Sequence, residues 1–202
     1  MSVGVGCTSA PVRYYTLTPA PDETSPASET TIAIDVRVVH TPPQLNRAEL
    51  MVRTGPTELT LLENERWASP VNDEIKDALR IELQRRLDRT TGLRAFAKLA
   101  LDIDVQQLEA DLGRYVLLEA SWSATLSATD RRSNGARLTA CTFRADEKIH
   151  TGYAGIVEGY QREIAALADA IVAVLTTPAS GIDAPCQKSI EDSAGGSGRK
   201  GH

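Results

Sequence analysis

Aromatic residues are scarce in this sequence of 202 residues, at 4% of the chain. Aromatic side chains supply the surfaces on which bases stack, so we expect no stacking platform for nucleic acid. Basic residues are not in excess either, since the formal net charge is −5 and the sequence pI is about 5.3. Proteins that bind nucleic acid usually carry a basic patch, and these values therefore exclude nucleic acid as a favoured partner.

Long hydrophobic runs and the common catalytic motifs are also missing. No stretch of about eighteen apolar residues occurs, so we expect no membrane-spanning helix. The sequence contains no G-x-G-x-x-G, no G-K-[ST] and no G-x-S-x-G. Its three histidines, His40, His150 and His202, have no second ligand at helical spacing and predict no metal site. We therefore predict no catalytic residue, no metal and no cofactor.

The clearest pattern in the chain is an amphipathic helix over about residues 70–90. Ser69 is suited to the N-cap and Pro70 to the first helical position. Asp73 and Glu74 lie in the first turn, where the helix dipole favours negative charge. Apolar residues recur at steps of three and four along one face, namely Val71, Ile75, Ala78, Leu79, Leu83 and Leu87. A second helix with the same kind of stripe is predicted over 153–176.

Strand patterns surround these helices. Residues 32–39 alternate between apolar and polar, and two short strands at 48–53 and 58–62 predict a hairpin around Gly55-Pro56. Residues 101–106 and 115–129 also alternate, and 137–147 return after an Asn134-Gly135 turn. The order of elements predicts an α+β fold, an antiparallel or mixed sheet with two helices packed on one face.

The two ends differ in composition from this single domain, which we assign to residues 31–178. We interpret residues 1–30 as a truncated leader, a lipidated cysteine and a flexible tether, because proline, serine and threonine are frequent there. Cys7 follows small residues and is either a lipid attachment site or an accidental surface thiol. The Gly/Ser-rich residues 179–202 predict a disordered tail.

Asp102 and Asp104 form the one pair of side chains that suggests chemistry. They are two residues apart on a predicted strand, so both leave the same face. Paired carboxylates are suited to acid–base catalysis or to calcium binding. A solvated polar face opposite Leu101, Ile103 and Val105 explains them more simply.

An ordered set of segments resembles the PqiC/YmbA family, the auxiliary lipoproteins of ABC-type intermembrane transport systems. The best match is Asn64-Glu65-Arg66-Trp67-Ala68-Ser69-Pro70-Val71, which is similar to the family's N-x-R-W-A-x-P-L. The resemblance also covers Cys7 with the nearby Tyr14-Tyr15-Thr16-Leu17, residues 49–53, and the strand that carries Trp122. In this comparison Arg66, Trp67, Pro70 and Trp122 are structural signature residues.

The resemblance implies a non-enzymatic lipoprotein on the periplasmic face of the outer membrane. Cys7 would be its acylated N-terminus, with palmitate among the attached chains, and would bind the protein to outer-membrane lipid. Its implied partner is a membrane-anchored MCE-domain protein that carries lipid between membranes, and the family also implies self-association into homo-oligomers. A periplasmic location implies that Cys141 and Cys186 form a disulfide, although Cys141 also fits a small buried core residue.

Two other functions remain compatible with these residues. The first is an interaction lipoprotein with the same fold that serves envelope-assembly machinery. The second is a small cytosolic enzyme that uses the face carrying Asp102 and Asp104. Co-purification with an MCE-domain protein separates transport from assembly, and an activity lost on replacing both aspartates would support an enzyme.

Overall fold

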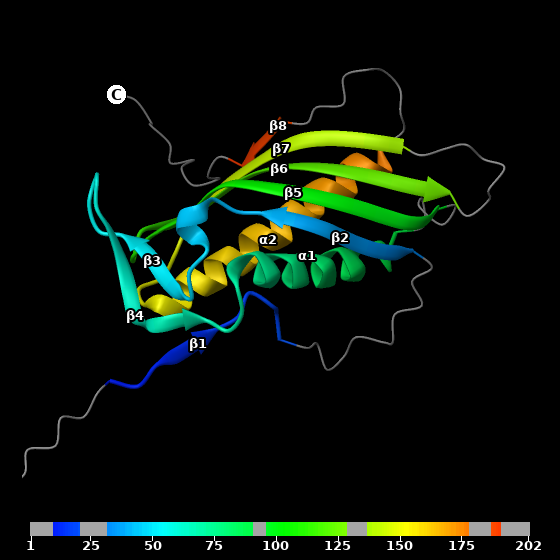
Figure 1. The fold of residues 1–202 in the computed structure, drawn as a ribbon. Helices are drawn as coiled ribbons and strands as arrows, with labels where there is room; N and C mark the ends of the chain where they lie inside the picture. The colour runs from blue at the N-terminus through cyan, green and yellow to red at the C-terminus, as the bar shows by residue number, and fades with distance from the viewer. Residues whose placement is uncertain (1–9, 21–31, 91–95, 129–136, 178–186, 191–202) are drawn as a thin grey trace, which may run out of the picture.

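The computed structural model describes residues 10–20, 32–90, 96–128, 137–177 and 187–190. These residues form one layer of strands and one layer of two helices, and both helices lie on the same side of the sheet (Figure 1). The predicted α+β class is therefore confirmed. The elements are β1 (Arg13–Tyr15), β2 (Ala33–His40), the 3-10 helix η1 (Pro43–Leu45), β3 (Glu49–Arg53), β4 (Leu59–Trp67), α1 (Val71–Leu87), β5 (Phe96–Asp111), β6 (Tyr115–Ala128), β7 (Arg137–Lys148), α2 (Tyr153–Thr176) and β8 (Gln187–Ile190).

The described strands form one mixed sheet in the order β1-β4-β3-β5-β6-β7-β8, with β2 paired to β5 outside this path. The antiparallel strands β5, β6 and β7 are its centre, whereas β1, β2 and β8 each pair with a neighbour in parallel. Alternation along β6 sets its register. Trp122 pairs with Ile103 on one side and with Cys141 on the other, and all three side chains are buried.

The core lies between the sheet and the helices. Every apolar residue of the predicted stripe on α1 is buried, which confirms the helix that the 3.6-residue period indicated. Helix α2 packs closely on the sheet at Gly159, where an added Cβ would lie 2.6 Å from Ile149 Cγ2 and 2.7 Å from Val116 Cγ2. Glycine at this position therefore allows the helix backbone to approach the strands.

Two short strands lie in segments that the sequence predicted to be flexible. Arg13–Tyr15 forms β1 within the predicted tether, and Leu17 just after it is fully buried. Gln187–Ile190 forms β8 within the predicted disordered tail. Each strand pairs in parallel with a long neighbour, so the hydrogen-bonding edge of that neighbour supplies order that local composition does not predict.

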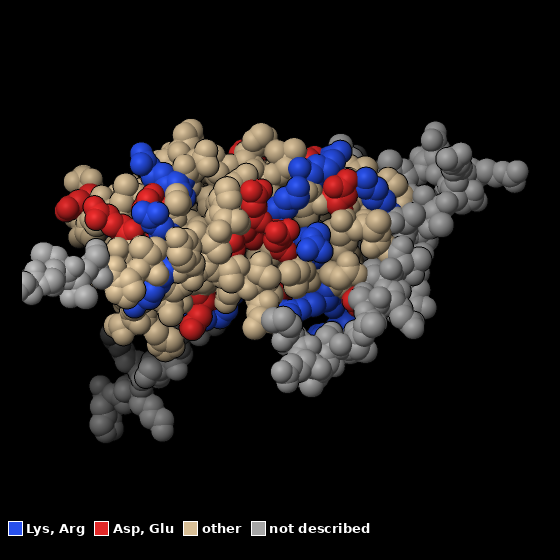
Figure 2. Space-filling view, turned by 60° about the horizontal axis from the view of Figure 1, so that its bottom comes forward, with Lys and Arg blue, Asp and Glu red and all other residues tan. Residues whose placement is uncertain are grey.

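The start of α1 also differs from the prediction. Pro70 is the N-cap residue, and its carbonyl accepts bonds from the backbone N–H groups of Asp73 and Glu74 at 2.8 and 3.0 Å. Ser69 makes no side-chain cap and instead donates to the Glu74 carboxylate. None of the described helices combines the length and apolar character needed to cross a bilayer. On the face shown in Figure 2, acidic and basic side chains are intermixed.

Candidate functional site

The first described strand, β1, begins six residues after Cys7 in the sequence, and its side chains bind a buried carboxylate on β4. Arg13 Nε donates to both carboxylate oxygens of Glu65 at 3.0 Å, and the Tyr15 hydroxyl donates to Oε2 at 2.7 Å. Glu65 is 4% exposed, and the Arg13 guanidinium lowers its pKa below the usual value. The side chains of β1 thus neutralise and satisfy a buried carboxylate on β4.

A second buried carboxylate, that of Glu74 on α1, fixes the residues that follow β1. Its Oε2 accepts from Thr16 Oγ1 at 2.7 Å and from the Leu17 N–H at 2.8 Å. Its Oε1 accepts from the Ser69 N–H at 3.0 Å and from Ser69 Oγ at 2.8 Å. One side chain therefore joins the N-terminal segment, the turn before α1 and the helix itself.

The residues of the N-x-R-W-A-x-P segment lie at this same junction. Trp67 is buried, and its ring centroid is 6.4 Å from that of Tyr160 on α2. The backbone N–H of Trp67 donates to the Ala48 carbonyl at 2.8 Å. Arg66 points to the other side of β4 and forms an ion pair with Glu49 at 3.3 Å. Pro70 begins the turn into α1. These contacts connect the sheet to both helices.

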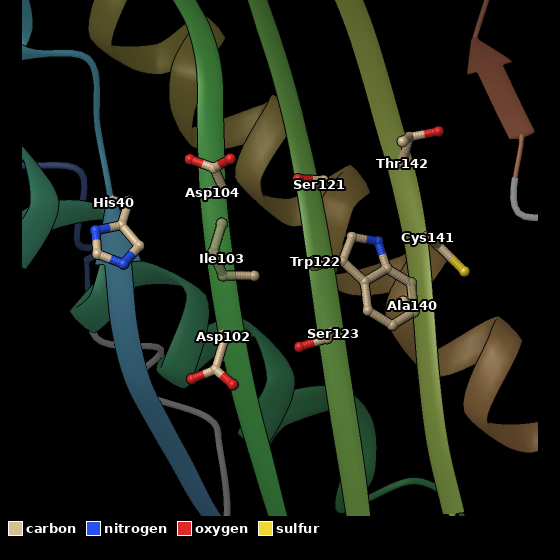
Figure 3. Close-up of a pocket in the computed structure, with 10 residues that line it drawn as sticks. All are labelled: His40, Asp102, Ile103, Asp104, Ser121, Trp122, Ser123, Ala140, Cys141 and Thr142. Carbon is tan, nitrogen blue, oxygen red and sulfur yellow. The ribbon is translucent and has the colours of Figure 1, made fainter.

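The face of the sheet away from the helices carries a shallow depression of about 560 Å³ (Figure 3). Small polar side chains of β6 and β7 form its floor, and His40, Asp102 and Asp104 lie along one side. Trp122 lines it only at the base, because its side chain is 3% exposed. The depression is open and shallow, unlike the enclosed pockets that bind small molecules.

The two aspartates in this depression are not arranged for catalysis. Asp102 accepts from Arg37 Nε at 3.0 Å in an exposed ion pair. Asp104 accepts from Gln106 Nε2 at 3.3 Å, and the same amide donates to Ser121 Oγ at 2.7 Å. Within the described part of the chain, no three His, Cys, Asp or Glu side chains gather as a metal site. The contacts match a solvated polar face with surface ion pairs.

Of the three cysteines, only Cys141 lies among the described residues. It is on β7, is 7% exposed and is disulfide-bonded. The predicted sites Cys7 and Cys186 lie outside the described residues. The residue after Cys186 is Gln187, whose Cα pairs in parallel with Thr142, the residue after Cys141.

A third buried carboxyl, that of Glu163 on α2, is only weakly compensated: the Leu118 backbone and the positive charge of Arg162 lower its pKa by less than burial raises it. The residue is 2% exposed, and neither carboxyl oxygen has a hydrogen-bond partner among the described residues. Burial, followed by the negative charges of Glu147 and Asp146, raises its pKa to about 9. The group is therefore protonated and neutral at pH 7. Glu163 interrupts an otherwise apolar helical stripe, and this interruption is the signal in the sequence from which a buried carboxyl could have been predicted.

Comparison with known proteins identifies a family and a fold. The family model for "ABC-type transport auxiliary lipoprotein component" matches residues 15–172. A crystal structure of an uncharacterized protein is similar at a TM-score of 0.60 and 16% identity, covering 82% of this chain and 99% of that one. Protein XCC0632 from Xanthomonas campestris gives a TM-score of 0.44 and 19% identity, covering 70% of this chain and 92% of that one. No curated protein matches the chain.

Proposed function

Because the chain belongs to the family of ABC-type transport auxiliary lipoprotein components, we propose that it is an outer-membrane lipoprotein that serves an MCE-type intermembrane lipid transport system. The domain faces the periplasm and is held to the bilayer by acyl chains, palmitate among them, on Cys7. It acts by binding and positioning a partner, and it catalyses no reaction.

The observation that carries this proposal is that β1, which begins six residues after Cys7 in the sequence, is fixed to β4. Arg13 already pairs with the buried Glu65, so only residues 8–12 separate the folded domain from the proposed lipid. Six chain steps span at most about 20 Å. The tether is therefore much shorter than the sequence composition predicted, and the sheet edge formed by β1 and β4 is held next to the membrane surface.

The strength of such an anchor follows from the hydrophobic effect. Each buried methylene contributes about 0.8 kcal/mol, so one chain binds weakly whereas two or more hold a protein firmly. A fixed attachment point restricts how such a domain lies on the membrane, whereas a long flexible tether would leave its orientation free. The carboxylates of Glu65 and Glu74 supply this attachment by fixing Arg13–Leu17 to β4 and α1.

The proposed partner is the MCE-domain membrane protein of the transport system, and the domain also associates with further copies of itself. The shallow face around Asp102 and Asp104 favours a binding role over catalysis, since Asp102 is already paired with Arg37. The same fold with another envelope client is the competing function. The identity of the co-purifying protein distinguishes the two.

We also propose that the disulfide of Cys141 is formed with Cys186. Acylation of Cys7 would leave these two as the remaining cysteines of the chain. The pairing of Thr142 with Gln187 supports the assignment, because each of these two residues directly follows one of the cysteines in the sequence. Formation removes two thiol protons and two electrons, which a disulfide-containing oxidoreductase of an oxidising compartment accepts. Peptide maps under non-reducing and reducing conditions should reveal the linked peptides, and two free alkylated thiols would contradict the pairing.

The test of function compares the wild-type protein with Cys7→Ser in the native host. We expect the wild type in the outer-membrane fraction, together with an MCE-domain protein after mild detergent extraction. The Cys7→Ser protein should leave the membrane fraction while keeping the same far-UV circular dichroism. Equal membrane association of both proteins would refute the anchor, and a co-purifying assembly factor without an MCE protein would refute the transport role.

A further inference from the structure

The central strand β5 is left uncovered over part of one edge. Strand β2 pairs with β5 as far as His40 and Asp104, and β3 meets the same edge again only at Arg53 and Asp111. Among the described residues, no strand pairs with the intervening stretch Val105–Ala110 on this side. The chain crosses from β2 to β3 through η1 in this interval, as Figure 1 shows.

The gap has a structural cause in β5 itself. The pairing of β5 with β6 shifts register between Val105 and Gln107, so an extra residue lies in β5. A bulge of this kind bends the strand and increases its twist. The two neighbours therefore approach β5 from different directions, one before the bulge and one after it. Within the described ranges, the backbone N–H and C=O groups on this edge between Asp104 and Asp111 therefore have no strand as a partner.

A groove of about 270 Å³ lies along this uncovered edge. Its floor is the β5 stretch from Gln106 to Ala110. Leu45 of η1, Met51 of β3 and Leu59 of β4 form an apolar part of its walls. Polar groups make up more than half of the exposed lining, and they belong to residues such as Gln44, Gln106 and Gln107. Leu59 is 48% exposed, so the groove is open to solvent and its apolar wall is unprotected.

The charged groups at one end of the groove are already satisfied. Glu109 accepts from Arg53 Nε at 2.8 Å and Nη2 at 2.5 Å, and from the Tyr115 hydroxyl at 2.6 Å. The Arg53 guanidinium lowers the pKa of Glu109 to about 2. Arg53 also donates to the carbonyl of Gly55 at 3.3 Å. This network holds the β3–β4 hairpin beside β5. Because Arg53 and Glu109 neutralise each other, this end of the groove carries no net charge to attract a charged ligand.

We propose that this groove binds an extended peptide segment of a partner protein, which adds a strand to β5 between β2 and β3. A peptide satisfies the backbone groups of Val105–Ala110 while its alternate side chains rest on Leu45, Met51 and Leu59. An acyl chain contacts the same three apolar side chains but leaves these backbone groups and the polar part of the lining buried and unpaired, which is costly. The uncovered edge therefore favours a peptide with alternating apolar and neutral polar residues over a lipid.

The test pans a library of random eight-residue peptides against the full chain and removes those that also bind Leu59→Arg. The matched control is Leu61→Arg, because Leu61 is 39% exposed on the same strand but does not line the groove. Enriched peptides should have alternating apolar residues, bind the wild type and Leu61→Arg alike, and bind Leu59→Arg at least tenfold more weakly. N-methylation of alternate peptide nitrogens on the pairing side should abolish binding.

Hydrogen–deuterium exchange locates the bound peptide independently of these variants. Binding should slow exchange of the amides in Val105–Ala110 by at least tenfold and leave β7 unchanged. Three results would overturn the proposal: no peptide that discriminates against Leu59→Arg, protection at another site, or protection of the groove by decanoate without any by peptides. The outcome is independent of acylation at Cys7, since the binding measurements use the chain in solution.

Discussion

Replacing Glu163 with glutamine is expected to stabilise the protein at neutral pH and to reduce the pH dependence of its stability. The carboxyl of Glu163 is buried without a hydrogen-bond partner among the described residues, and burial raises its pKa from 4.5 to about 9. In the unfolded chain the group ionises near its ordinary value. Between these two values the folded state binds one more proton, so stability falls as pH rises. Below about pH 4.5 the carboxyl is protonated in both states, so this loss of stability disappears.

The size of the effect follows from the two pKa values. One pKa unit corresponds to about 1.4 kcal/mol. Keeping Glu163 protonated between its unfolded pKa of 4.5 and pH 7 therefore lowers the free energy of unfolding at pH 7 by at most about 3.4 kcal/mol. Water penetration and local relaxation reduce this limit. Burying the neutral amide of glutamine also retains some desolvation cost. We therefore expect Glu163→Gln to raise the free energy of unfolding by about 1–2 kcal/mol at pH 7.

Urea unfolding of both proteins between pH 5 and pH 8 measures this gain. The advantage of Glu163→Gln over the wild type should be small at pH 5 and should grow with pH, because only the wild type must retain the extra proton. Glu158→Gln is the matched control, since Glu158 is exposed on the same helix. Its difference from the wild type should stay within about 0.5 kcal/mol across the range.

Two results would refute this reasoning. The first is an advantage of Glu163→Gln that does not change between pH 5 and pH 8. The second is a carboxyl carbon resonance of Glu163 that titrates below pH 6 in the folded protein. Either result would mean that the carboxyl reaches solvent or a cation, and that α2 packs less closely on β6 and β7 than described.

Three further predictions concern the contacts around the N-terminal segment and the sheet. Trp67→Ala should lower the free energy of unfolding by about 3–5 kcal/mol in urea titrations, because it removes a large buried side chain. Arg66→Ala should lower it by less than about 1 kcal/mol, since the ion pair of Arg66 with Glu49 is partly exposed. Glu74→Ala should lower the free energy of unfolding by about 3 kcal/mol and speed amide exchange at Leu17, because the donors of Thr16, Leu17 and Ser69 lose their acceptor. Unchanged exchange at Leu17 would contradict the role of this carboxylate. Acidification should destabilise the wild type as pH falls from about 4.5 towards 2, because the ion pair of Glu109 contributes stability only while its carboxylate is ionised. In thermal scans, the Tm of Glu109→Gln should fall less steeply than that of the wild type over this range.

Elements defined by local periodicity were predictable from the sequence. The apolar steps from Val71 to Leu87 predicted α1, and strict alternation from Tyr115 onward predicted β6. The stripe from Ile156 to Ile171 predicted α2 in the same way. Each of these segments is long enough that its pattern would rarely arise by chance. Each also buries one face against the helices or the sheet, so its apolar residues recur at the spacing of that face.

The missed elements depend on contacts between distant residues. Strand β1 has three residues in a proline-rich segment, and it is ordered because Arg13 and Tyr15 bind Glu65, at least 50 positions along the chain. Glu74 looked like a first-turn acid that favours the helix dipole, yet its carboxylate binds residues 16, 17 and 69. Composition reports the average preference of a segment and carries no information about such partners.

The candidate sites were predictable to different degrees. The resemblance marked Trp67 as a structural signature residue, and in the structure its side chain is buried beside Tyr160 of α2. The interpretation of Asp102 and Asp104 as a solvated face also agrees with their surface contacts. The groove along β5 had no signal in the sequence, because it results from where β2 ends and β3 begins on a shared edge.

The most direct test of a lipid-anchored transport accessory is the N-terminal mass of the protein recovered from membranes of its native host. We predict a mature chain that begins at Cys7 and carries the additional mass of acyl chains, among them palmitate. This result would establish processing, export and anchoring together. A chain recovered in the soluble fraction with a free thiol at Cys7 and intact residues before it would contradict the proposed anchor and the membrane location that depends on it.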